Sequence, residues 1–113
     1  MTEPKSVADV LDAAADLLTP EGAWTQGALA KAADGEWVDS GLSPAASCWC
    51  LLGAVERGGG NPVWSAARRV IATALGVDER EGIPTWNDAP ERTQPEVVAK
   101  LREAAALARE QGL

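Results

Sequence analysis

Residues 7–18 read VADVLDAAADLL, and this stretch decides the fold class. Its apolar residues recur three and four positions apart, as they do along the buried side of an amphipathic α-helix. Ser6 and Asp9 form an N-terminal cap pair, and Pro20 follows the last apolar residue. The sequence therefore predicts a helix from Val7 to Leu18 that buries one side.

The other side of this helix is acidic. The chain has ten basic and seventeen acidic residues, a net charge of −7, and nine of the acids but three of the bases lie in residues 1–60. This excess argues against nonspecific binding to nucleic acid or to an anionic membrane. The acidic side of the helix has two interpretations: it is a solvated surface, or it is an acidic face that binds a basic partner. The residues of this acidic face are Asp9, Asp12, Asp16 and Glu21.

Two more helices are expected after proline signals. Ser43-Pro44 places a capping residue before a proline at the first helical position and predicts a helix from there to about Glu56. Three glycines at 58–60 end it, and Asn61-Pro62 opens another helix that continues to Gly76. We expect these two helices to pair across the glycine hinge.

The last helix is predicted from a capping box. Residues 77–93 are polar and contain two prolines, which indicates a loop with one helical turn around Trp86. Thr93 and Glu96 then form the capping box, and Gly112 is a suitable terminator.

Residues 28–38 lack helical spacing. They read as two short segments around Ala33-Asp34-Gly35-Glu36, whose Asp-Gly pair favours a tight turn. We expect a β-hairpin here, although alanine is a poor strand former and a helix is the alternative. An isolated two-stranded ribbon is marginally stable, so Trp37 and Leu29 are expected to pack it against the helices.

Together these patterns predict a mainly α, small α+β fold. The expected architecture is a four-helix compact domain spanning residues 1–113, with a short β-hairpin near residues 28–38. At this length one hydrophobic core suffices without a disulfide framework or a metal.

The residue types present offer little catalytic equipment. Histidine, the commonest general base and metal ligand, is absent. Cys48 and Cys50 lack a partner base and, two residues apart on a helix, are not expected to bridge. We interpret them as buried core thiols, with a cysteine-dependent enzyme as the alternative. No catalytic residue, metal site or cofactor is predicted, and no membrane span or leader is recognised, which makes a reducing cytoplasm the expected compartment.

The candidate site consists of two short segments, each of which joins a tryptophan to small polar residues. We call these segments the two islands. They are residues 24–27, WTQG, and residues 86–90, WNDAP. One hypothesis is that they meet in space, so that the two indoles wall a shallow ligand pocket. The alternative is that the polar groups bond local backbone while the second indole anchors its loop. The candidate residues are Trp24, Thr25, Gln26, Trp86, Asn87 and Asp88.

Four motifs carry a resemblance to a known family. WTQGA at 24–28, ADG at 33–35, CLLGA at 50–54 and WNDAPERT at 86–93 resemble those of short actinobacterial and phage-encoded proteins of unknown function. The resemblance covers most of the chain in the same order and implies no activity, cofactor or catalytic residue.

The favoured interpretation is a small non-enzymatic interaction or ligand-binding module. Its partner would be a protein or a small ligand, bound at the surface formed by the two islands. An acidic phage accessory protein that occupies a basic site on a host nucleic-acid-binding or defence protein is the second hypothesis.

Overall fold

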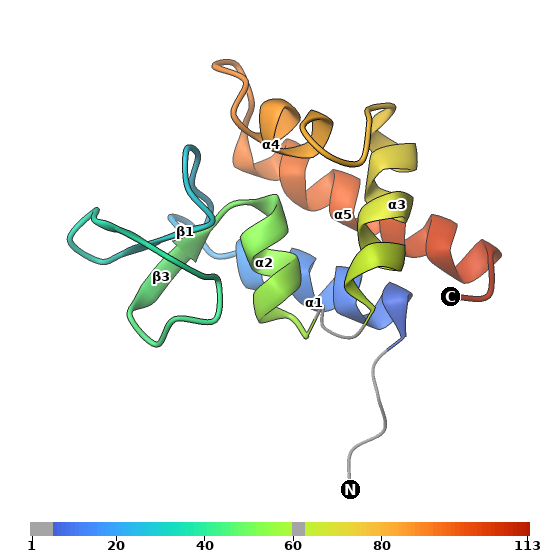
Figure 1. Ribbon diagram of the computed structural model, residues 1–113, viewed down its shortest axis with the longest axis horizontal. Coiled ribbons are helices and arrows are strands. Elements are labelled where there is room, and N and C mark those ends of the chain that lie inside the picture. The colour runs from blue at the N-terminus through green and yellow to red at the C-terminus, as the bar shows by residue number, and fades with distance from the viewer. Residues whose placement is uncertain (1–5, 60–62) are drawn as a thin grey trace, which may run out of the picture.

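Five helices and a small antiparallel sheet make up the described residues, 6–59 and 63–113, of the computed structural model (Figure 1). This confirms the mainly α fold with a small β component. The elements in chain order are α1 Val7–Leu18, β1 Ala30–Ala32, β2 Trp37–Val38, β3 Ala46–Trp49, α2 Leu51–Arg57, α3 Trp64–Leu75, α4 Gly82–Asn87 and α5 Gln94–Glu110.

Helices α1 and α5 lie antiparallel and form the centre of the helical part. Both start where their caps were predicted: Ser6 Oγ accepts from Asp9 N at 3.0 Å, and Thr93 N donates to Glu96 Oε1 at 3.0 Å. Their buried faces are rich in alanine, which lets the two backbones approach closely. The helix ends α1 Leu18 and α3 Leu75 also agree with the prediction.

The predicted hairpin is present as β1 and β2, but its packing was predicted wrongly. Ala30 pairs with Val38 and Lys31 with Trp37, and β3 adds a third strand in the order β2-β1-β3. Trp37 is 69% exposed and Leu29 is 38% exposed, so neither packs the hairpin onto the helices. The sheet instead projects at one end of the molecule (Figure 1) and is held there through β3.

The helix expected from Pro44 to Glu56 is wrong in its first half. Ser43 caps a tight turn by accepting from Ala45 N at 3.2 Å, and residues 46–49 pair with β1 as β3. Helix α2 begins later, where Cys50 Sγ accepts from Gly53 N at 3.3 Å. The Ser43-Pro44 helix signal does not decide this segment, because residues 46–49 form their backbone hydrogen bonds with β1, which is distant in the sequence.

Trp49 fixes β3 to two neighbouring segments. Its backbone N donates to Ala23 O at 2.8 Å, and its O accepts from Thr25 N at 2.9 Å. Its buried indole Nε1 donates to Gly41 O at 2.9 Å. The first tryptophan island is thereby placed alongside the start of α2.

Gly53 allows this region to pack tightly. A Cβ there would lie 1.9 Å from Leu29 O, so α2 can approach the 27–29 segment because residue 53 lacks a side chain. The predicted turn around Trp86 is present as α4, whose Ile83 is fully buried. The predicted helix start at Asn61-Pro62 and the last hinge glycine lie outside the described residues.

Among the helices of residues 6–59 and 63–113, none combines the length and the apolar character needed to cross a membrane.

Candidate binding site

Asn87, the last residue of α4, ties three segments together. Its side chain is buried, with 2% of the residue exposed. Oδ1 accepts from Trp24 Nε1 at 2.8 Å and from Leu51 N at 3.1 Å, while Nδ2 donates to Thr25 O at 3.2 Å and to Asp88 Oδ1 at 2.9 Å. A buried amide that uses both its oxygen and its nitrogen in this way fixes the relative position of its partners.

The two islands also meet around this amide. Gln26 Nε2 donates to Asn87 O and to Ala89 O, both at 2.9 Å, and Gly27 N donates to Asp88 Oδ1 at 3.0 Å. The structure thus brings the two islands together, as the first hypothesis expected. Several of the same polar groups bond backbone, but these bonds join segments 36 to 63 residues apart and are not the local turn bonds that the structural alternative expected.

The two indoles do not wall one pocket together, although Trp86 lines two other hollows on the surface. The half-buried Trp24 is held by its Nε1 against Asn87. The guanidinium carbon of Arg92 lies 3.8 Å from the ring centroid of Trp86, and Arg92 Nε donates to Trp86 O at 2.9 Å. Neither indole lines the pocket described next, so that part of the prediction was wrong.

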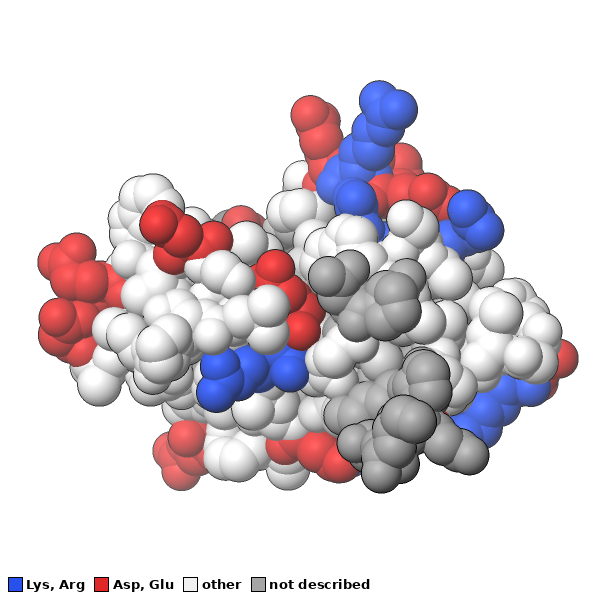
Figure 2. All heavy atoms as spheres, turned by 60° about the horizontal axis from the view of Figure 1, so that its bottom comes forward, with Lys and Arg blue, Asp and Glu red and all other residues white. Residues whose placement is uncertain are grey.

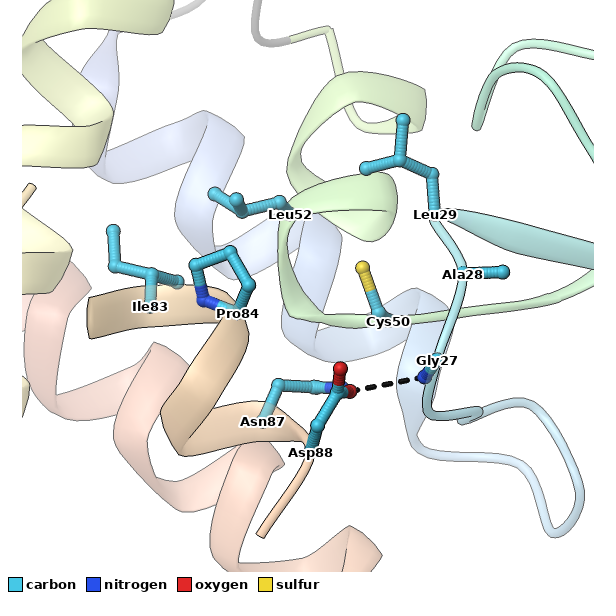
Figure 3. Close-up of a pocket in the computed structure, with 9 residues that line it drawn as sticks. All are labelled: Gly27, Ala28, Leu29, Cys50, Leu52, Ile83, Pro84, Asn87 and Asp88. Atoms are coloured by element: carbon cyan, nitrogen blue, oxygen red, sulfur yellow. Dashed lines mark hydrogen bonds between the residues drawn. The ribbon is translucent and has the colours of Figure 1, made fainter. Parts of the chain in front are cut away.

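A pocket of about 250 Å³ opens beside the Asn87 junction (Figure 3). We call it the junction pocket. Helix α4 stands on one side of it and the 27–29 segment on the other, and the Cys50 sulfur projects between them from the start of α2. The residues that line it are Gly27, Ala28, Leu29, Cys50, Leu52, Ile83, Pro84, Asn87 and Asp88.

The junction pocket has apolar walls and one carboxylate. Asp88 is exposed at the rim; its Oδ1 accepts from Gly27 N and Asn87 Nδ2, while its Oδ2 has no hydrogen-bond partner among the described residues. No Lys or Arg is among the lining residues. A group with an apolar body and a positive or hydrogen-bond-donating end matches this arrangement.

Cys50 lines the junction pocket, and its surroundings favour the protonated thiol by raising its pKa. Burial raises its pKa, and the nearby Asp88 carboxylate acts in the same direction, outweighing the hydrogen bond from Gly53 N. A thiolate nucleophile needs a lowered pKa, which this environment does not provide. Cys48 and Cys50 are both free and half-buried. In residues 6–59 and 63–113, no three Cys, Asp or Glu side chains cluster in a way that could hold a metal.

The predicted acidic face is partly neutralised. Arg102 contacts Asp12 at 3.0 Å and Asp16 at 2.5 Å, and Arg109 contacts Asp12 at 2.5 Å and Asp9 at 4.0 Å. Burial raises the pKa of Asp12, but the hydrogen bonds from both arginines outweigh it and lower the pKa below its usual value.

The remaining acids do not form a single patch on the face in Figure 2. That view shows acidic side chains at several separate places, with basic ones between them. Glu21 is exposed beyond the end of α1.

The sequence hypothesis missed the apolar walls. Leu29, Ile83 and Pro84 lie within a few residues of the polar groups, whereas Leu52 comes from a separate stretch, and only the fold places all four around one space. A usable signal was the CLLGA stretch at 50–54, because it combines Cys50 and Leu52 with the glycine on which the 27–29 segment packs.

The chain belongs to a family of unknown function, DUF6197, whose model matches residues 2–107. This confirms the resemblance to a family without an assigned activity. No curated protein and no solved structure matches the chain.

Proposed function

We propose that this protein is a small non-enzymatic binding module and that the junction pocket is its binding site. The pocket would take a compact apolar group whose positive or hydrogen-bond-donating end meets the Asp88 carboxylate. The observation that carries the proposal is the pairing of apolar walls with a single rim carboxylate that keeps one oxygen available.

The rigidity of the site supports this function. Asn87 and Gln26 fix the two islands before any ligand arrives, through hydrogen bonds of 2.8–3.2 Å. A preformed site loses less conformational entropy on binding, so a small contact area can give useful affinity. Ligand sites of this kind are mostly apolar with a few placed polar groups.

The other two hypotheses gain less support. The acidic face has three of its four carboxylates in contact with arginines of α5, which leaves less free charge for a basic partner. The raised pKa of Cys50 disfavours thiolate chemistry. We further propose that binding takes place in the cytoplasm, in keeping with the two free thiols.

Small compounds of matched shape test the proposal. Butylamine, butanol and butyrate share an apolar tail but end in a cation, a neutral donor and an anion. We expect butylamine to shift the amide NMR signals of residues 27–29, 50–52, 83 and 85–88 at the lowest concentration and butyrate at the highest. If these signals stay unmoved with all three compounds, the proposed function is wrong.

Two charge-removing variants sharpen this test. In Asp88→Asn the amide oxygen can still accept from Gly27 N, so the fold is kept and the preference for butylamine over butanol should disappear. Asp34→Asn is the matched control, because Asp34 also accepts a backbone N–H, from Glu36 at 3.0 Å, but lies outside the pocket. That control should keep the preference.

A further inference from the structure

A second hollow adjoins the junction pocket. It measures about 220 Å³ and shares Gly27, Ala28 and Leu29 with the junction pocket, while its other wall includes Trp37 and Asp39. We call it the hairpin hollow. The 27–29 segment therefore has one hollow on each side.

Trp37 is exposed to an extent that the fold does not require. It belongs to β2, a two-residue strand at the edge of the sheet, and 69% of it is open to solvent. Leu29, between the two hollows, is 38% exposed. Exposed indoles beside hollows are typical of the residues that contribute most to protein recognition.

Each hollow is lined by one carboxylate and by no basic side chain. Asp88 lines the junction pocket and Asp39 lines the hairpin hollow, and neither lining contains Lys or Arg. Lys31 is the cross-strand partner of Trp37, but it lines neither hollow. With the net charge of −7, this surface is complementary to a positively charged partner.

We propose that the two hollows together form the docking site for an extended basic segment of a partner protein. One apolar side chain of the segment enters the junction pocket, a second lies against Trp37, and neighbouring Lys or Arg side chains face Asp88 and Asp39. This inference rests on the proposed function, because it assumes that the junction pocket binds a ligand.

The sizes of the hollows favour a peptide over a single small molecule. Each hollow is smaller than the roughly 300–1,000 Å³ of sites that enclose drug-sized ligands, and each suits one side chain. In an extended peptide, alternate side chains point the same way and lie about 6.6 Å apart, which lets two of them straddle one chain segment.

A random octapeptide library displayed on phage tests the inference. We expect the enriched peptides to share two apolar residues spaced two apart, with Lys or Arg beside them. Enrichment of sequences without this pattern, or no enrichment over an unrelated acidic protein, would overturn it. A synthetic peptide of the enriched sequence should bind more weakly as salt rises, since exposed charge pairs are screened.

Trp37→Ala is the decisive variant because the fold does not depend on this side chain. We expect its affinity for the synthetic peptide to fall about tenfold or more, as for a central interface tryptophan, with an unchanged circular dichroism spectrum. Leu42→Ala removes another exposed apolar side chain, 55% open, that lines neither hollow, and should leave the affinity within about twofold. Equal peptide binding by Trp37→Ala and the unmodified protein would refute the docking site.

The two proposals can fail separately. If butylamine still shifts the amides around the junction pocket while no peptide binds, the docking inference is wrong and the proposed function stands. If neither probe binds, both are wrong.

Discussion

Replacing Asn87 with alanine tests whether the polar junction holds the two islands together. The substitution leaves Leu51 N, at the buried start of α2, without its acceptor at 3.1 Å, which costs about 2 kcal/mol. Trp24 Nε1 is half-buried and loses its acceptor at 2.8 Å, adding about 1 kcal/mol. The void left by the amide adds about 1 kcal/mol.

The expected loss of unfolding free energy is therefore about 4 kcal/mol, a large part of the roughly 5–15 kcal/mol of a typical domain. Urea unfolding followed by circular dichroism measures it, and the denaturant slope should not change. Gln111→Ala is the control, because it truncates an exposed amide and should cost less than about 0.5 kcal/mol. A loss below about 1.5 kcal/mol for Asn87→Ala would refute the reasoning, since a single unmet buried donor accounts for that much.

Three further predictions concern packing, charge and thiol chemistry. Gly53→Ala should destabilise by about 3 kcal/mol or more, because its Cβ would lie 1.9 Å from the carbonyl oxygen of Leu29; a melting temperature within two degrees of the original would contradict this. The lowered pKa of Asp12 contributes stability that is fully present above about pH 3.9, the pKa of the unfolded carboxyl, and that is lost as the pH falls through the folded-state pKa. Between pH 5 and pH 2 the Asp12→Asn variant should therefore lose less unfolding free energy than the unmodified protein does. The difference should be under about 1 kcal/mol because the site is near the surface. In a Cys48→Ser variant, Cys50 should react with a thiol reagent at pH 7 far more slowly when folded than in urea, whereas equal rates would show an accessible thiolate.

The helices could be predicted from the sequence because their signals are local. The caps at Ser6 and Thr93 and the left-handed Gly76, with φ of 71°, act within one turn of the helix ends that they define. The hairpin was predictable for the same reason, since Asp34 accepts from Glu36 N inside the turn.

The third strand could not be predicted in this way. Residues 46–49 carry a helix-start signal just before them, and their strand partners lie 14–25 residues earlier in the chain. Trp49 supplies the buried anchor that makes this pairing stable, but its burial depends on Gly41 and on the 23–25 segment. A short window of neighbouring residues contains none of the strand partners and none of residues 23–25.

For the candidate site, the sequence predicted the polar groups correctly but gave the pocket the wrong walls. Asn and Asp beside tryptophan indicated a specific junction, and Asn87 forms one. The direction of each indole depended on packing around α4, where Arg92 covers the ring of Trp86 and neither residue lines the junction pocket. The exposure of Trp37 likewise follows from the position of the sheet at one end of the molecule.

The hydrogen bonds of Asn87 span 36 residues to Leu51 and 63 residues to Trp24. Contacts so distant along the chain form late in folding, because the entropy of closing long loops must first be overcome. The walls of the junction pocket should therefore assemble in one final cooperative step. An occupant would slow hydrogen exchange in all three segments together, because whatever binds the closed state alone suppresses its opening.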